Sequence, residues 1–211
     1  AQLAALSATL KARGGHLVVD EIYHGLTYGF DAPSVLQVDD DAFVLNSFSK
    51  YFGMTGWRLG WLVAPPALLA NAVMCKQFSD ANTSTLAQAT AAAYLQSGRL
   101  PAAVEKVRTT YAARARQMGA CLQRELGAAV EFSEPHGGMF FWVRLTGAQG
   151  RERDAGVLAQ RAIERLVAFV PGAPFFAEHP DPSCLRMSFA TCDEARIEEG
   201  IHRMAQALQS A

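Results

Sequence analysis

Apolar residues recur along this chain with two different spacings, and each spacing predicts a different kind of element. Short continuous apolar runs predict three buried strands, at 16–20, 42–46 and 59–63. A helical spacing then predicts three helices, at 67–79, 84–96 and 101–126. The first half of the chain is therefore expected to contain part of an α/β sheet that leads into a long helix.

The chain begins with a helical pattern rather than with a strand. Leu3, Leu6 and Leu10 share one face of a helix predicted at 1–13, and the Gly14-Gly15 pair ends it. A sequence that starts inside a helix, without a Met or a capping residue, is expected to be a piece of a longer polypeptide.

Beyond the long helix, the pattern predicts a smaller α+β unit. Its strands are expected at 129–132, 139–145, 167–170 and 185–189. Its helices are expected at 153–165 and 193–209. Thr191 with Glu194 three residues later predicts a capping box at the start of the last helix. A domain boundary within the long helix divides the chain into residues 1–110 and 111–211.

Composition and charge exclude several classes of protein. With 211 residues, 50% of them hydrophobic, the chain can bury a sizeable core. Its net charge of −1 offers no basic surface for binding nucleic acid or acidic lipid. No apolar stretch reaches the roughly 20 residues that span a bilayer. The expected partner is a small molecule.

The cysteines and histidines show no metal-ligand spacing. Cys75, Cys121, Cys184 and Cys192 are scattered without a CxxC pair, and Asp20-Glu21-x-x-His24 is too loose for a metal site. A chain with this much apolar sequence does not need disulfides. Free thiols in a reducing cytoplasm are expected, and no metal site is predicted.

Chemically capable side chains gather where the predicted strands meet their loops. Asp20 ends the first strand, and Ser47, Ser49 and Lys50 follow the second. The chain has only four lysines against fifteen arginines, and this lysine stands between two apolar runs. In open α/β sheets, ligands bind outside the carboxyl ends of the strands. These side chains are therefore expected to line one site.

With Tyr23 and Arg58, the set matches the functional groups of pyridoxal phosphate (PLP). A lysine among apolar neighbours loses its proton more readily and can form a Schiff base. A carboxylate can keep the pyridine nitrogen protonated, so that the ring acts as an electron sink. Hydroxyls and a guanidinium can hold a phosphate, and a phenol can bond to the ring oxygen.

Two stretches carry a resemblance to a known family. VVDEIYHGLTYG (18–29) and NSFSKYFGMTGWRLGW (46–61) resemble the signature segments of the PLP-dependent aminotransferases of class I and II, fold type I. The D-x-x-Y, the S-x-S-K and an arginine eight residues after the lysine all stand at the family's spacing. The resemblance implies that Lys50 is the catalytic Schiff-base lysine. It implies a cofactor-binding role for Asp20, Tyr23, Ser47, Ser49, Lys50 and Arg58.

The carboxy-terminal part extends the resemblance. CLRMSFA (184–190) is similar to the family's strand whose arginine binds the substrate α-carboxylate, which implies that role for Arg186. A guanidinium fork suits a carboxylate better than an ammonium does. PGAPFF (171–176) resembles the family's turn before that strand, with Phe176 in place of a frequent glycine.

The resemblance covers nearly all of this chain but only the carboxy-terminal part of the family's pattern. It implies part of the PLP-transferase large-domain sheet, followed by a long helix and an α+β small carboxy-terminal domain. It also implies transfer of an amino group between an amino acid and a 2-oxo acid, in a cytoplasmic homodimer. The isolated piece is expected to hold an incomplete cofactor site.

The sequence also fits two alternatives to the transaminase. The same fold serves as the non-enzymatic sensor domain of MocR-type transcription regulators, and an upstream winged-helix segment would favour that function. Ser47-Phe48-Ser49-Lys50 also fits the S-x-x-K of penicillin-recognising hydrolases, but that family requires S-D-N and K-T-G, which this sequence lacks. The hydrolase alternative is therefore set aside.

Overall fold

The computed structural model describes residues 2–146 and 154–209, and these form two compact units. The first unit spans Ala1–Arg108 and the second Thr109–Ala211. Helix α4 (Leu100–Glu125) supplies residues to both units. Pro101 stands in the first turn of α4, where its missing N–H costs nothing, and Gly127 follows its end with a φ of 47°.

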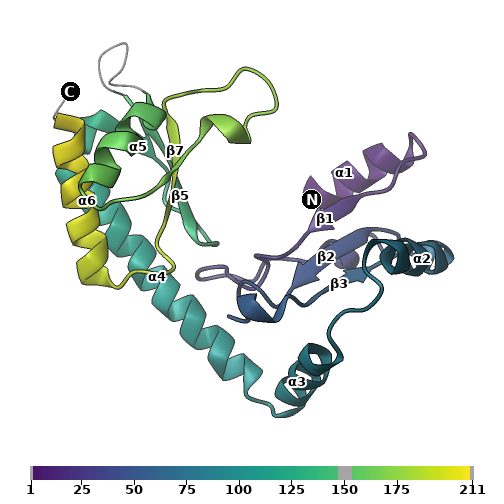
Figure 1. The fold of residues 1–211 in the computed structure, drawn as a ribbon. Helices are drawn as coiled ribbons and strands as arrows, with labels where there is room; N and C mark the ends of the chain where they lie inside the picture. Colours follow the sequence, from purple (N-terminus) through teal and green to yellow (C-terminus); the bar gives the residue numbers. More distant parts are fainter. Residues whose placement is uncertain (1, 147–153, 210–211) are drawn as a thin grey trace. The chain divides into compact units, whose positions relative to one another are not determined.

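The first unit is built on a three-stranded sheet in the order β1-β2-β3 (Figure 1). The strands are β1 (Val18–Asp20), β2 (Phe43–Ser47) and β3 (Gly60–Val63). β1 runs parallel to β2, and β3 runs antiparallel to it. Each strand coincides with a predicted apolar run, with ends that differ by one or two residues.

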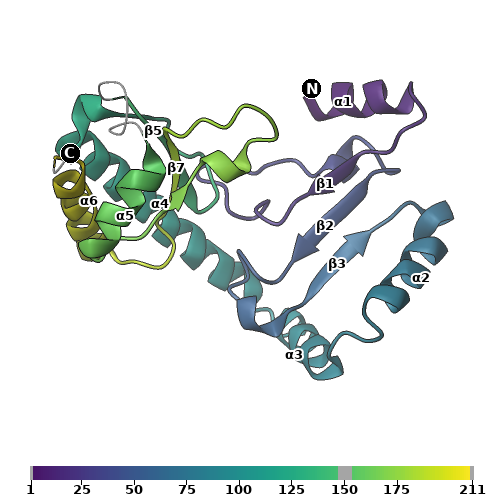
Figure 2. The ribbon, with the colours of Figure 1, turned by 45° about the horizontal axis from the view of Figure 1, so that its top comes forward.

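One face of this sheet is covered and the other is bare. Helix α1 (Gln2–Lys11) packs over the first face, where the buried residues are Leu17, Val35, Ala42 and Val44 (Figure 2). On the opposite face, Leu45 pairs in register with Asp20 on one side and Leu62 on the other. Leu45 is 43% exposed and Leu62 is 41% exposed. The second face therefore presents apolar side chains to solvent.

The other helices of the first unit follow β3. A short turn, η3 (Pro66–Leu68), leads into α2 (Leu69–Ser79), and α3 (Thr85–Gln96) comes next. The Ser84 hydroxyl caps α3 by accepting a hydrogen bond from the N–H of Ala87 at 3.3 Å. These two helices match those predicted at 67–79 and 84–96 closely.

The second unit is an antiparallel sheet with helices on one face (Figure 1). Its strand order is β4-β5-β7-β6, made of β4 (Val130–Phe132), β5 (Phe140–Leu145), β7 (Cys184–Ser188) and β6 (Val170–Pro171). Helices α5 (Ala155–Glu164) and α6 (Glu194–Gln209) cover the sheet together with α4. The core between the layers holds fully buried side chains, among them Leu122, Phe141, Leu185, Phe189 and Ile201.

Two local predictions for the second unit are wrong. The strand expected at 167–170 is reduced to Val170–Pro171, because Leu166 adopts a left-handed backbone (φ 61°) and the N–H of Val167 still bonds to the carbonyl of Ala162. Thr191 does not cap α6. The Asp193 carboxylate does so instead, accepting from the N–H of Arg196 at 2.9 Å. Residue 153, where the helix before β6 was expected to begin, lies outside the described residues.

Two further features concern the cysteines and the helices. All four cysteines are free thiols. Within residues 2–146 and 154–209, none of the helices combines the length and the apolar character that crossing a bilayer requires.

Candidate cofactor and substrate sites

Strand directions in the first unit bring its predicted site residues to one edge of the sheet. Asp20 is the last residue of β1 and Ser47 the last of β2. Because β3 is antiparallel, its first residue, Gly60, pairs with Ser47, and Arg58 lies only two residues before Gly60. The edge formed by the two carboxyl ends thus also receives Arg58, although Arg58 precedes its strand.

The hydroxyls of Ser47 and Ser49 form a pair. The Ser47 Oγ lies 3.0 Å from the Ser49 Oγ and 3.0 Å from the carbonyl oxygen of Leu59. It also accepts a 3.0 Å hydrogen bond from the N–H of Ser49. Ser47 is the donor in both contacts, so its single hydrogen is shared between the Ser49 Oγ and the Leu59 carbonyl, and the Ser49 hydrogen is not used in this pair. Ser47 then braces the loop, and the Ser49 hydroxyl keeps capacity for a ligand.

Arg58 is tied to the same loop through Thr55. The Thr55 hydroxyl donates to the carbonyl of Ser49 at 2.6 Å, and Arg58 Nη1 donates to the carbonyl of Thr55 at 3.1 Å. Arg58 is exposed and adopts a left-handed backbone with a φ of 51°. This conformation is costly for a residue with a Cβ, and such strain is concentrated at functional sites. Two hydroxyls and a guanidinium are thereby presented by one short segment.

Lys50 lies beside Tyr23. Lys50 Nζ is 5.7 Å from the centroid of the Tyr23 ring, and both residues are half-buried. The distance is within the range of a cation–π contact. It joins the turn after β1 to the loop after β2, so the predicted lysine and phenol come together.

Asp20 keeps an oxygen available at the same edge. Its Oδ1 accepts a hydrogen bond from the N–H of Ile22 at 3.0 Å, and the residue is exposed. Within the described residues, the other carboxylate oxygen of Asp20 has no hydrogen-bond partner. That oxygen can therefore accept a hydrogen bond from a ligand.

Tyr51 is a further residue beside the candidate cofactor site, and it was not predicted from the sequence. Its ring packs on Phe52 at a centroid distance of 4.0 Å and lies directly against the backbone of Gly25. Burial raises the pKa of the Tyr51 phenol; the Asn46 side chain opposes this rise, and the negative charge of Glu21 adds to it. The position next to Lys50 could have drawn attention to Tyr51, but nothing in the sequence indicated its contact with Gly25.

Arg186 belongs to the second unit and is held among aromatic rings. It lies on β7, paired with Trp142 on β5 and Val170 on β6. Its Cζ is 4.3 Å from the ring centroid of Phe140 and 4.6 Å from that of Phe175. The Nε is buried and has no hydrogen-bond partner among the described residues. Phe140 was not singled out from the sequence, because MFFWVRL reads as a core strand.

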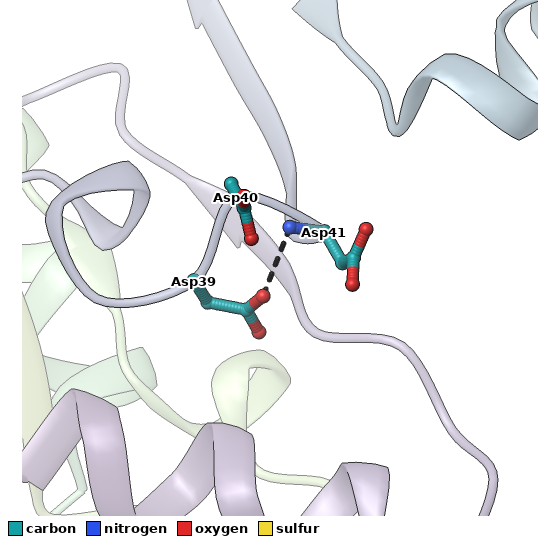
Figure 3. A group of neighbouring side chains, drawn as sticks. All are labelled: Asp39, Asp40 and Asp41. Atoms are coloured by element: carbon teal, nitrogen blue, oxygen red, sulfur yellow. Dashed lines mark hydrogen bonds between the residues drawn. The ribbon is translucent and has the colours of Figure 1, made fainter.

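A cluster of acidic side chains in the first unit has a structural role. Asp39, Asp40 and Asp41 place their carboxylates within 4.8 Å of one another (Figure 3). Asp39 is buried, and it accepts hydrogen bonds from Ser7, from Lys11 and from the N–H of Asp41. Its oxygens are thus occupied, and the cluster anchors α1 to the loop before β2.

Comparison with known proteins identifies the family. The family profile described as aminotransferase class I and II matches residues 1–204. The 2-aminoadipate transaminase of Thermus thermophilus is 36% identical over 203 residues, covering 93% of this chain and 50% of that protein. Aromatic-amino-acid aminotransferase 1 of Thermococcus litoralis is 30% identical over 196 residues, covering 92% and 46%. The chain thus spans about half the length of the curated relatives it matches.

Solved structures agree with these relatives. The α-aminoadipate aminotransferase LysN of Thermus thermophilus, complexed with N-(5'-phosphopyridoxyl)-L-leucine, superposes with a TM-score of 0.89 at 34% identity. The match covers 99% of this chain and 54% of the LysN chain. The multiple substrate aminotransferase of Thermococcus profundus gives a TM-score of 0.89 at 30% identity, with 99% and 51% covered.

The fold and these comparisons together define a PLP-transferase of the aminotransferase type. The chain belongs to the class I and II aminotransferase family. The predictions of this family, of its α/β fold and of its cofactor, pyridoxal phosphate, are confirmed.

The residues present fit this cofactor. A phosphate dianion needs several hydrogen-bond donors and a positive charge, which Ser49 and Arg58 offer on one loop. A pyridine nitrogen needs an acid partner, and Asp20 retains an oxygen for it. A reactive aldehyde needs an amine, and Lys50 stands between these groups in the sequence and beside Tyr23 in space.

Proposed function

We propose that this chain supplies the lysine-bearing part of a PLP-dependent aminotransferase that exchanges an amino group between an amino acid and a 2-oxo acid. The observation that carries the proposal is the loop after β2, in which Thr55 links Ser49 to Arg58 through hydrogen bonds of 2.6 and 3.1 Å, the Ser47 hydroxyl bonds to that of Ser49, and Lys50 follows Ser49 directly. That loop offers phosphate donors and an amine on adjacent residues.

Each of these residues has a defined role in this function. Ser49 and Arg58 hold the phosphate, with Ser47 bracing them, and Asp20 keeps the pyridine nitrogen protonated. Tyr23 donates to the ring oxygen. When bound, the cofactor supplies an electron sink for the bond broken at the substrate Cα. Lys50 Nζ anchors the cofactor and moves the proton that leaves the Cα. Arg186 binds the substrate carboxylate.

Several properties of the whole protein follow as parts of the same proposal. The enzyme works as a cytoplasmic homodimer, and its partners are small amino and oxo acids. The relatives named above act on 2-aminoadipate and on aromatic amino acids, and one structure holds a leucine adduct. A screen of amino donors therefore starts with 2-aminoadipate, phenylalanine, tyrosine and leucine, with 2-oxoglutarate as acceptor.

The test uses the full-length protein loaded with PLP. The wild type is expected to show a visible absorption band from cofactor bound to Lys50 and to transaminate at least one donor. Lys50→Ala should abolish both, whereas Lys76→Ala, which removes an exposed lysine of α2 paired with Asp80, should change neither. Transamination retained in Lys50→Ala would refute the catalytic role of Lys50. A wild type that binds PLP without turning over any donor would favour the MocR-type sensor instead.

A further inference from the structure

The guanidinium carbon of Arg186 lies over two phenylalanine rings. Phe140, on β5, contributes a ring 4.3 Å from Cζ, and Phe175, at the end of the turn η6 (Ala173–Phe175), contributes a ring 4.6 Å away. Stacking of this kind is a cation–π interaction, and it is favourable when a ring covers the flat face of a guanidinium. Two elements far apart in the sequence thus hold one side chain.

The hydrogen-bonding capacity of Arg186 remains unused. Guanidinium donors all point outward in the plane of the group, and a cation–π contact with a ring uses none of them as a hydrogen-bond donor. Among the described residues, Arg186 has no carboxylate partner, and its buried Nε has no acceptor. A buried N–H without an acceptor is unfavourable. The ring contacts therefore hold the Arg186 side chain without using its N–H donors, which stay available for a ligand.

The backbone fixes Phe175 in this position. Gly172 donates a 2.6 Å hydrogen bond to the carbonyl of Cys184 on β7, and a Cβ at position 172 would come within 2.7 Å of Cys184. Only glycine allows the turn to approach β7 so closely. The indole of Trp142 then meets the Phe175 ring edge-on, at a centroid distance of 5.8 Å. Phe175 is consequently supported from two sides, although its ring is half open to solvent.

We propose that Phe140 and Phe175 are positioning residues, which hold the Arg186 guanidinium flat so that its edge meets the substrate α-carboxylate. The inference rests on the proposed function, because Arg186 is taken to bind that carboxylate. The two rings act through Arg186 rather than by selecting the substrate side chain. Their effect must then be the same for every substrate that carries the carboxylate, and it must vanish for an amine that lacks it.

The experiment compares amino acids with the matching amines in the full-length, PLP-loaded enzyme. The pairs are L-phenylalanine with 2-phenylethylamine and L-leucine with 3-methylbutylamine, and the half-reaction is followed by the loss of the visible band. Phe175→Leu and Phe140→Leu should each lower the preference for the amino acid over its amine by about tenfold, mainly through KM, and equally in both pairs. Phe175→Tyr, which keeps the ring, should retain the preference.

A matched control separates positioning from general damage. Phe132→Leu removes another ring of the second unit, one that packs against Phe141 at 5.5 Å, and should leave the preference unchanged. A loss confined to the phenylalanine pair would overturn the inference, because the rings would then be contacting the substrate side chain. An unchanged preference in both leucine variants would overturn it as well. Either result leaves the Lys50 test intact, whereas transamination by Lys50→Ala would refute the proposed function itself.

Discussion

The backbone of Gly25 lies against the ring of Tyr51 so closely that a Cβ at position 25 would come within 2.5 Å of the Tyr51 Cδ2. Real Cβ atoms essentially never approach another atom within 3.0 Å. The contact joins the turn that carries Tyr23 to the loop that carries Lys50. It is therefore one of the contacts that set the position of the phenol relative to the amine.

Gly25→Ala should destabilise the protein through this contact. Overpacking at a closed position costs about 1–3 kcal/mol, and the same shift should displace Tyr23 from Lys50 and weaken PLP binding. Chemical denaturation and a PLP titration of the full-length apoprotein measure both effects. Gly200→Ala, on α6 where a new Cβ meets nothing within 4 Å, is the matched control and should not destabilise.

A second substitution tests whether Tyr51 is the cause. Gly25→Ala combined with Tyr51→Leu should recover stability relative to Gly25→Ala alone, because the smaller side chain makes room for the added methyl group. Additive losses in the double variant would show that the contact does not determine the cost.

Ser49→Ala should weaken cofactor binding more than it weakens the fold. The loss of a hydrogen bond to a charged group amounts to about 1.5–3 kcal/mol, so the Kd for PLP should rise at least tenfold. Equilibrium titration of the visible band measures the change. Ser97→Ala removes a hydroxyl that donates to the carbonyl of Tyr94 and accepts from the N–H of Arg99 at the end of α3, and the PLP affinity of that variant should match the wild type.

Arg58→Gly should separate affinity from stability. Glycine adopts the left-handed backbone of position 58 without strain, a gain of about 1 kcal/mol that its greater freedom in the unfolded chain largely offsets. The thermal midpoint of the apoprotein should therefore stay close to that of the wild type, while the Kd for PLP rises at least tenfold because the guanidinium is gone. A midpoint that falls as steeply as the affinity would instead assign Arg58 a structural role.

Asp39→Asn should destabilise the first unit in a pH-dependent way. Hydrogen bonds from Lys11 and Ser7 lower the pKa of the Asp39 carboxyl, and the bond to Asp39 raises the pKa of Lys11. A lowered carboxyl pKa stabilises the fold above the unfolded value of about 4, and this contribution is lost as the pH falls through the folded value. The raised lysine pKa contributes below about 10.4 and is lost at higher pH.

The measurement for Asp39→Asn is the thermal midpoint as a function of pH. The difference in thermal midpoint between the variant and the wild type should be largest and constant between about pH 5 and 9, and it should become smaller towards pH 3. Asp40→Asn, at an exposed neighbouring position, is the control and should show little gap at any pH. A gap for Asp39→Asn that is constant down to pH 3 would contradict the ionic role of Asp39.

The sequence predicted those features that depend on local pattern and on coupled residue types. The apolar runs located β1, β2 and β3, and the spacing of Asp20, Tyr23, Ser47 and Lys50 predicted a single site because each of these residues ends a strand or lies in the loop after one. Arg58 was also expected at that edge, but the structural reason for its position could not be predicted in this way. It depends on the antiparallel direction of β3, which sequence periodicity does not report.

Other features depend on contacts between distant segments. Phe140 and Trp142 are two residues apart on β5 and therefore share one face of the strand. Only the pairing of β5 with β7 brings the Phe140 ring close to Arg186. The contact of Tyr51 with Gly25 likewise joins two loops. The predicted cap of α6 was wrong for a more local reason. Asp193 and Thr191 are both good capping residues, and the helix begins directly after Asp193.

The bare face of the first sheet has a consequence for handling the protein. Val18, Leu45 and Leu62 lie on this face, and each is more than 40% exposed. Such surfaces adhere to one another and to hydrophobic dyes. Chromatography of the 211-residue polypeptide by itself should accordingly depend on loading concentration and detergent, and a charge introduced by Leu62→Glu should restore a sharp, concentration-independent peak.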